Sequence, residues 1–393
     1  YDSGGMVPSG NNYTNRVVID VDVTVRSVNG PEHTFIVGQS HNGANGPLAV
    51  RCVRISDGLL TGFTITNGYT QTEGDWGAYQ RGGGVFLDQG GVVSNCVISG
   101  CSASMTGGGV DFHYGGVVVD CLIENNTASP SSGNGGGGVS LHDGALLERC
   151  TVRNNAVTGS GADGGGLYFY SGGHVRNCLI VGNTANDCGG GLYARSDALD
   201  SLIENCTIAG NTGQHGGGVY LHGSTSRNCI IFGNTGTVDQ PNYGSGGGST
   251  AFEHCCTIPD AGGSNITDEP LFADADYHLQ ATSPCIDGGW NIGGTDHGMD
   301  GTPRPLDGDA DGTATTDIGC YEYCNRGADS DGDVMTDGFE MDYGLDPTDP
   351  ADEHGNLDGD PMDNRDEFIA DTNPTDPSSY LCITVVSNNS PVT

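Results

Sequence analysis

The chain has 393 residues, of which 69 are glycine, and its 50 acidic residues outnumber 13 basic residues, giving a formal charge of -37. This charge argues against nucleic acids and anionic lipid surfaces as partners, and no apolar run reaches the roughly 18 residues of a membrane span. The glycines lack a three-residue period and the apolar residues fall in regular short runs, which excludes collagen and a simple disordered polymer.

Two segments near the N-terminus alternate apolar and polar residues, as half-buried strands do. They are RVVIDVDVTVRSVNG from Arg16 and LLTGFTITNG from Leu59. We expect them to form the irregular first coils of the repeat that follows.

From Gly82 onward, a unit recurs that starts with a glycine triplet, continues into a short apolar strand and ends in a strand that contains a cysteine. The triplets start at Gly82, Gly107, Gly136, Gly164, Gly189 and Gly216, with a degenerate copy at Gly246, and the cysteines are Cys96, Cys121, Cys150, Cys178, Cys206 and Cys229. Short repeated strands without a helical pattern are typical of the coils of a parallel β-helix, which stack about 4.8 Å apart. We therefore predict an all-β solenoid of about eight or nine coils.

Stacked coils place equivalent residues in columns, and period-two alternation sorts these columns into inward and outward faces. The first residue after each triplet is apolar and is expected to point inward: Val85, Val110, Val139, Leu167, Leu192 and Val219. We interpret the cysteine column as free, buried thiols, because a thiol packs as a small hydrophobe. Five residues after these cysteines an asparagine recurs, at Asn126, Asn155, Asn183, Asn211 and Asn234. Such a column suits a stacked turn with bonds between amides and left-handed backbone.

The region from about Arg16 to Ile258 resembles the right-handed parallel β-helix repeat superfamily of the pectate-lyase type. The segments EPLFADADYHLQATSPCIDGG from Glu269 and TPRPLDGDADGTATTDIGCYEY from Thr302 resemble a module that follows such helices in bacterial surface proteins with variable C-terminal anchors. The resemblance implies a right-handed helix over residues 1–260 and a small β-rich cap over 261–325. It does not imply one activity, because this fold hosts lyases, hydrolases, adhesins and passive fibres.

Beyond residue 325 the acidic residues recur at the spacing of a calcium loop. Positions 1, 3, 5, 9 and 12 are Asp329, Asp331, Asp333, Asp337 and Glu340, and 27 residues later they are Asn356, Asp358, Asp360, Asn364 and Glu367. Calcium takes about six to eight oxygens, and this spacing wraps alternate side chains around one ion. We predict two Ca²⁺ loops within residues 326–378. A weaker third candidate, Asp307, Asp309 and Asp311, lacks the carboxylate at position 12.

These loops resemble the EF-hand-like calcium loops of dockerins and type 3 thrombospondin repeats, which are common in secreted bacterial proteins. The resemblance implies an extracellular or cell-surface location. Val334 and Pro361 stand at position 6, where glycine is usual.

The last residues, 379–393, contain an apolar run from Leu381 to Val386 that predicts one isolated β-strand. This strand either opens a further domain or pairs with another chain, because an unpaired strand invites such pairing.

Two outward columns of the repeat carry the candidates for ligand binding. Tyr168, Tyr193 and Tyr220 are candidates for a carbohydrate-binding platform, and His142, Arg195 and His222 are the weaker candidates for a catalytic base and a cation, as a lyase would need. Repetition alone also places like residues in columns, and stacked aromatic residues stabilise sheets without a ligand.

Two further signals are weak. Cys285 could form a disulfide with Cys320, or Cys320 with Cys324, and the sequence does not decide between them. Asn12, Asn125, Asn265 and Asn388 begin matches to the glycosylation motif.

The preferred reading is a calcium-stabilised structural or adhesive protein that is secreted or lies at the cell surface. Its expected partners are itself, by head-to-tail assembly into a fibre, and extracellular polysaccharide. The alternatives are a polysaccharide lyase or hydrolase and a non-catalytic glycan-binding module.

Overall fold

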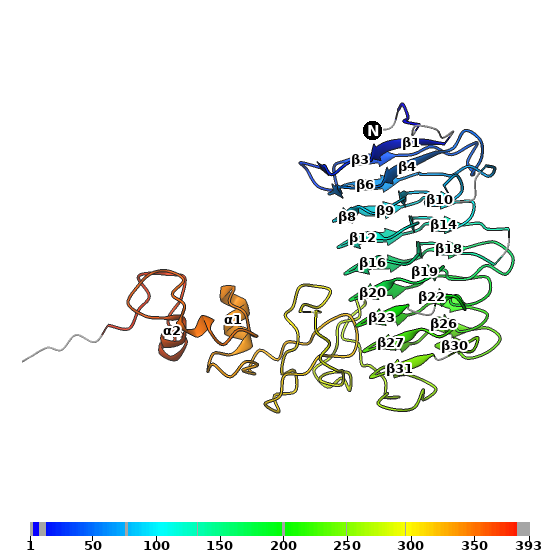
Figure 1. Ribbon diagram of the computed structural model, residues 1–393. Helices are drawn as coiled ribbons and strands as arrows, with labels where there is room; N and C mark the ends of the chain where they lie inside the picture. The colour runs from blue at the N-terminus through cyan, green and yellow to red at the C-terminus, as the bar shows by residue number, and fades with distance from the viewer. Residues whose placement is uncertain are drawn as a thin grey trace, which may run out of the picture.

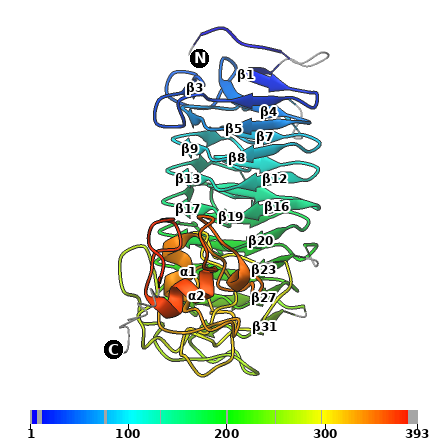
Figure 2. The same cartoon turned by 90° about the vertical axis from the view of Figure 1, so that its left-hand side faces the viewer.

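The computed structural model describes residues 3–7, 13–74, 78–131, 133–198, 201–248, 250–294 and 296–382. Three short strands per coil stack into three nine-stranded sheets, and every strand pairing between coils is parallel (Figures 1 and 2). The fold is therefore the predicted all-β parallel solenoid, with about eight turns.

Each sheet takes one strand from every coil. The first sheet contains β1 (Thr14–Ile19), β4 (Val50–Ile55), β7 (Val85–Leu87), β11 (Val110–Phe112), β15 (Val139–Leu141), β19 (Leu167–Phe169), β22 (Leu192–Ala194), β26 (Val219–Leu221) and β30 (Tyr243–Ser245). The second contains β2 (Thr24–Arg26), β5 (Leu59–Thr61), β8 (Val92–Ser94), β12 (Gly116–Val119), β16 (Ala145–Glu148), β20 (His174–Arg176), β23 (Leu202–Glu204), β27 (Thr225–Arg227) and β31 (Ala251–Glu253). The third contains β3 (Phe35–Val37), β6 (Thr64–Thr66), β9 (Val97–Ser99), β13 (Leu122–Glu124), β17 (Thr151–Arg153), β21 (Leu179–Val181), β24 (Thr207–Ala209), β28 (Ile230–Phe232) and β32 (Cys256–Thr257). Two small sheets pair β10 (Ser102–Ala103), β14 (Thr127–Ala128) and β18 (Ala156–Val157), and β25 (Thr212–Gly213) with β29 (Thr235–Gly236).

The interior is one continuous apolar core that runs along the solenoid axis. The predicted inward column is fully buried, with Val85, Leu167 and Val219 all at 0% exposure. The predicted cysteine column is buried in the same core. All fifteen cysteines lie within the described residues and are free. The predicted disulfides of Cys320 with Cys285 or Cys324 are therefore wrong, because Cys285 packs against the last coil with Cys256 instead.

The asparagine column forms a ladder of amides. Asn155 shows the pattern: its Nδ2 donates to Ile123 O at 2.9 Å and to Asn183 Oδ1 at 3.0 Å, and its Oδ1 accepts from Asn126 N at 2.9 Å. The left-handed backbone lies one residue earlier than we predicted, at residues such as Asn125 and Asn154. The ladder asparagines thus bond to neighbouring coils while the preceding residue makes the turn.

The segment after β32 covers the end and one side of the solenoid. Ile266 forms a bridge with Cys256 on the last coil, and Cys285 and Ile318 pack with Ile230 of β28. Figure 1 shows this segment beside the last coils. Among the described residues between Ile258 and Thr336 there are isolated bridges but no strand. The prediction of a β-rich cap is therefore wrong. Its glycines, prolines and aspartates favour turns over ladders.

A buried ion pair lies at the centre of the cap. Arg304 Nε lies 2.7 Å from Glu322 Oε2 with both side chains at 0% exposure, and Arg304 Nη1 donates to Asn177 Oδ1 of the solenoid. The backbone N–H groups of Leu306 and Asp317 donate to the Glu322 carboxylate. These contacts fix the cap to the lower coils.

The C-terminal region projects sideways from the lower coils and contains two short helices, α1 (Asp337–Tyr343) and α2 (Asn364–Ala370), and a 3-10 turn, η1 (Asp352–His354) (Figure 1). In the described part of the chain, no helix has the length and apolar composition that crossing a membrane requires. The strand predicted from Leu381 to Val386 falls mainly outside the described residues.

Candidate functional site

The first acidic loop gathers carboxylates, and several of their oxygens have no hydrogen-bond partner. Asp329, Asp331 and Asp333 each present a carboxylate oxygen within 4.8 Å of the others. Asp331 Oδ2 and Asp333 Oδ2 are buried without a hydrogen bond, and Glu340 is fully buried with neither carboxylate oxygen bonded. Burial and the neighbouring carboxylates of Asp331 and Asp333 raise the pKa of Glu340 to about 8. A buried carboxylate without a partner is strongly unfavourable, and a bound cation would remove that cost.

Position 9 of this loop differs from the prediction. Asp337 is buried, but both of its oxygens are bonded to Ser330, one to the N–H and one to the hydroxyl. The additional carboxylate is that of Asp352, which groups with Asp333 and Glu340 and has an unbonded, buried Oδ1. The sequence pattern missed Asp352 because it lies twelve residues beyond the end of the loop, at the start of η1.

The second loop repeats the arrangement with fewer charges. Asp358, Asp360 and Glu367 group within 4.8 Å, and each has one buried oxygen without a hydrogen bond. Asn356 Oδ1 accepts the Gly359 N–H, as Asp329 accepts the Gly332 N–H in the first loop. The second group therefore has three carboxylates.

The two loops touch through one side chain. Asn364, at position 9 of the second loop, is buried and its Nδ2 donates to the Asp352 carbonyl at 2.8 Å. Its Oδ1 has no hydrogen bond. The residue next to Asn364 pairs with the residue next to Asp352, since Arg365 Nη1 lies 2.9 Å from Glu353 Oε2. Asn364, a candidate ligand of the second loop, is thus bonded to the backbone of Asp352, a candidate ligand of the first.

The third candidate loop has a different composition from the one predicted. Asp307 and Asp309 group with Asp287 rather than with Asp311. Asp307 uses both oxygens to accept the N–H groups of Asp311 and Gly312, which closes a turn. Its carboxylate is thereby satisfied by backbone.

The predicted tyrosine column forms a continuous stack on the first sheet. The rings of Tyr168 and Tyr193 stack at 5.5 Å between centroids, and those of Tyr193 and Tyr220 at 5.9 Å. Tyr168 is not an accessible platform residue, because it is only 1% exposed and its hydroxyl donates to Asn134 and Gly133 of the covering loop. Tyr193 and Tyr220 are half-buried and present the accessible part of the stack.

The predicted catalytic candidates do not form one group. His142 and Arg195 both contact Tyr170. The His142 ring stacks on the Tyr170 ring with 4.5 Å between centroids, and the Arg195 guanidinium lies 4.4 Å from the centre of the same ring. His222 lies against Tyr193 and Tyr220 instead. Burial lowers the pKa of His142 to about 4, and the side chain is only 8% exposed. A base of this kind is poorly placed to take a proton from a polysaccharide.

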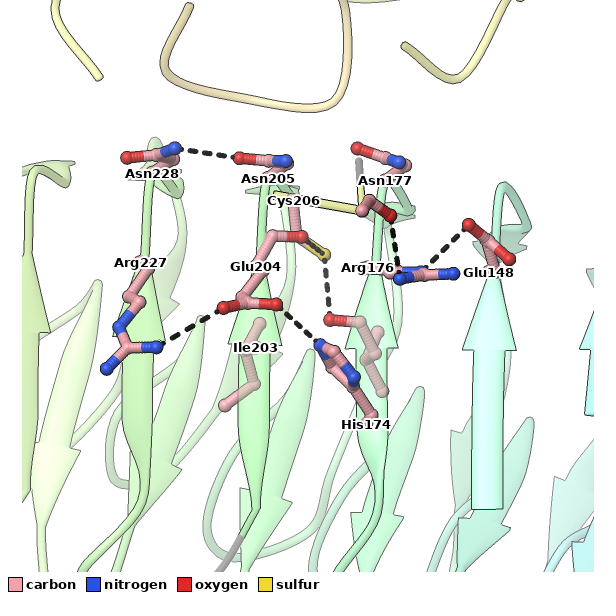
Figure 3. A network of polar contacts seen from close by, with 12 residues as sticks. Glu148, His174, Arg176, Asn177, Ile203, Glu204, Asn205, Cys206, Arg227 and Asn228 are labelled. Atoms are coloured by element: carbon pink, nitrogen blue, oxygen red, sulfur yellow. Dashed lines mark hydrogen bonds and ion pairs between the residues drawn. The ribbon is translucent and has the colours of Figure 1, made fainter. Parts of the chain in front are cut away.

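The second sheet carries a ladder of alternating charges that sequence reasoning missed. Glu204 lies between His174 and Arg227, with Nε2 of His174 2.7 Å from Oε2 and Nη1 of Arg227 3.4 Å from Oε1 (Figure 3). Two residues after His174 on β20, Arg176 pairs with Glu148 at 2.8 Å and also donates to Gly294 O of the cap. The charges within these pairs neutralise one another. We therefore assign them structural roles, which are to hold neighbouring coils in register and to attach the cap to the solenoid.

A further cluster of possible ligands lies directly before two consecutive glycine triplets, those that start at Gly164 and Gly189. Asp163, Asp187 and Cys188 each present one ligand atom within 4.8 Å of the others. The sequence signal was present in the column of residues that precede the triplets, but its members differ in type and therefore do not stand out as a repeat.

The comparisons with known proteins address the solenoid. A family model described as a right-handed β-helix region matches residues 35–180 and 83–258, which together span more than half of the chain. Neither the curated proteins nor the solved structures gave a match.

Proposed function

Because the chain belongs to the right-handed β-helix family, we propose that it is a structural or adhesive protein of the cell surface or extracellular space. In this proposal the solenoid is a rigid spacer, and two calcium ions order the C-terminal region that follows the cap. The fold is compatible with this role and with carbohydrate-active enzymes, so the proposal depends on the sites.

The observation that carries the proposal is the fully buried Glu340, whose two carboxylate oxygens have no hydrogen-bond partner. Together with Asp331, Asp333 and Asp352 it offers hard oxygen ligands, which calcium prefers. A carboxylate at position 12 of such a loop binds calcium through both oxygens, and this accounts for two free oxygens on one buried side chain.

The same chemistry supports the proposed extracellular or cell-surface location. Loops of extracellular modules bind calcium with dissociation constants of roughly 0.1–1 mM, which suits calcium-rich surroundings. Val334 takes the left-handed position of the first loop at φ 91°, where glycine is usual, and this strain weakens the loop relative to a loop with glycine.

Calcium titration by calorimetry tests the proposal. Wild-type protein should bind two calcium ions, Glu340→Gln should lose one of them, and Glu340→Gln combined with Glu367→Gln should lose both. Asp342→Asn is the matched control, because this acidic residue lies on α1 but pairs with Arg326 at the surface. Wild-type protein that binds no calcium at 5 mM, or a double variant that binds as wild type does, would refute the proposal.

A second function is favoured by the tyrosine stack. Tyr193 and Tyr220 stack with their planes 15° apart, and the His222 ring lies against both. Aromatic faces flanked by hydrogen-bond donors suit sugar rings. Binding on a panel of polysaccharides that is lost in Tyr193→Ala and retained in Tyr114→Ala, an exposed tyrosine outside the stack, would establish glycan binding. Turnover of the same panel would instead favour the lyase or hydrolase alternative.

In the same proposal, the chain assembles with itself through its first coil. β2 and β3 of the first coil have no further strand beyond them among the described residues, whereas residues around Ile266 cover the last coil. Sedimentation with and without calcium tests assembly directly, and a monomer under both conditions excludes the fibre.

A further inference from the structure

A second kind of ion site lies on the solenoid itself, where consecutive coils turn into the first sheet. The residues directly before three glycine triplets are Asp163, Cys188 and His215. Gly164 N donates to Cys188 O at 3.0 Å, Gly189 N donates to His215 O at 2.9 Å, and Cys188 pairs with His215 as a parallel bridge. The three side chains therefore stack coil upon coil in one column.

The oxygen and sulfur atoms of this column converge. One ligand atom each of Asp163, Asp187 and Cys188 lies within 4.8 Å of the other two. Asp163 is only 7% exposed, and its Oδ1 accepts the Cys188 N–H at 2.9 Å. This bond fixes the Asp163 carboxylate beside the thiol and leaves Oδ2 without a backbone partner. Two carboxylates and a thiol at this spacing repel one another once ionised, unless a cation lies between them.

His215 lies beside this group, and the carboxylate of Asp239 orients its ring. His215 Nδ1 lies 2.7 Å from Asp239 Oδ2, and Nε2 lies 3.8 Å from Asp187 Oδ1. Asp239 is itself held by the Gly216 N–H through Oδ1. Metal-binding histidines are commonly oriented this way, by a carboxylate on the ring nitrogen that does not face the ion. Asp239 lies outside the three-residue group, so this orientation is an observation independent of it.

We propose that Asp163, Asp187, Cys188 and His215 bind one transition-metal ion of the zinc class. A thiolate and an imidazole are ligands that zinc and its neighbours prefer and that calcium does not use, so this site is chemically distinct from the acidic loops. The side chains of Asp187 and His215 are about one-third exposed, at 36% and 33%, which gives an ion access from solvent.

The bound ion would join three consecutive coils beside the tyrosine stack. Asp163 and Cys188 are close enough to Tyr193 to influence its hydroxyl electrostatically. The ion would therefore add positive charge next to the accessible rings of Tyr193 and Tyr220, on a molecule of net charge -37. This extends the proposed glycan-binding face, but the ion site stands without it.

Cobalt(II) is the probe, because thiolate ligation gives a charge-transfer band in the near ultraviolet. The full chain is stripped with a chelator, saturated with calcium to fill the acidic loops, and titrated with Co²⁺. We expect one equivalent to bind with the charge-transfer band, and zinc to displace it. Cys188→Ser should abolish the band, and Asp239→Asn should weaken binding about 10- to 100-fold.

Cys382→Ser is the matched control, because Cys382 is exposed and far along the chain, and it should keep both band and affinity. His215→Gln is the second variant, because a side chain that is about one-third exposed can be replaced without loss of folding. It should weaken Co²⁺ binding, while its circular dichroism spectrum should stay that of wild type. Failure of wild type to bind Co²⁺ stoichiometrically, or a band that survives Cys188→Ser, would overturn the proposal.

Discussion

The solenoid and the C-terminal region differ in what they bury: apolar side chains in the first and acidic side chains in the second. In the solenoid, each coil buries apolar columns and bonds to its neighbours through three sheets and an asparagine ladder. Between residues 326 and 382 no buried cluster of comparable size exists among the described residues, and the most deeply buried side chains include Asp337, Glu340 and Glu367. The first region is stabilised by its own packing, whereas in our proposal bound calcium stabilises the second.

The contrast explains why the chain contains both an excess of glycine and an excess of acidic residues. Glycine is concentrated where coils must turn, as at Gly164, whose φ is 69° and whose added Cβ would meet the Leu167 carbonyl at 2.3 Å. Acid is concentrated where ions are proposed to replace a core. A coil thus depends on its neighbours, and in our proposal a loop depends on its ligand.

The largest expected effect is the separation of the two regions by calcium removal. With a chelator, the C-terminal helices should unfold at ambient temperature, because the carboxylates around Glu340 are left uncompensated, while the solenoid should melt within about 2 °C of its calcium-bound value. Differential scanning calorimetry checks this. A solenoid transition that falls together with that of the tail would show that the regions are not independent.

The next largest effect concerns the asparagine ladder. Asn155→Ala should destabilise the solenoid by about 4 kcal/mol, because it leaves the Asn126 N–H and the Ile123 carbonyl buried without partners. Asn186→Ala, which removes an exposed asparagine that bonds only to nearby backbone, is the control and should cost less than about 1 kcal/mol. Denaturant unfolding in calcium measures both, and equal effects would contradict the role of the ladder.

A smaller effect is an acid sensitivity of the solenoid that originates at His142. Its pKa of about 4 lies below the unfolded value of 6.5, so its contribution is complete above pH 6.5 and is lost as pH falls towards 4. The loss is about 3 kcal/mol. Burial is the main cause, and the charged groups around it are Asp111, which opposes the shift, and Arg81, His113 and Arg195, which support it.

His142→Gln should therefore lose less stability than wild type between pH 7 and pH 4.5, as measured by denaturant midpoints. His222→Gln, in the half-buried position of the same column, should follow wild type. Identical pH profiles for wild type and His142→Gln would contradict a buried neutral histidine.

The smallest effect distinguishes the two acidic loops from each other. Asp352 Oδ2 accepts the Asp346 N–H, and at the equivalent place of the second copy Ser379 Oγ accepts the Asn373 N–H. At this place the first loop thus has a carboxylate that the second loop lacks. Asp352→Ser should weaken the tighter calcium site about tenfold and Ser379→Asp should strengthen the weaker one by a similar factor, as measured by calorimetric titration. Unchanged affinities in both variants would exclude Asp352 as a ligand.

Repetition decided how much of this could be predicted. The inward column of Val85, the cysteines and the ladder asparagines recur through the regular coils, and the sequence alone indicated their burial or their stacking. Positions 3, 5 and 12 of both acidic loops and position 1 of the first also follow from spacing, and the structure brings these carboxylates into groups.

What the sequence did not indicate depends on segments that fold over the repeat. Tyr168 is covered by the loop that contains Asn134, and Asp352 reaches the first loop from η1. Asp163, Cys188 and His215 form a column whose members differ in chemistry, so periodicity does not single them out. Cys285 lies beside Cys256 because the cap folds back onto β28 and β32.

Hydrogen exchange measured by mass spectrometry, with calcium and after chelation, tests the central claim most directly. The account predicts that peptides from 326–382 lose their protection when calcium is removed, whereas peptides from β7 through β28 exchange at unchanged rates. Protection of 326–382 that is the same in both conditions would contradict it.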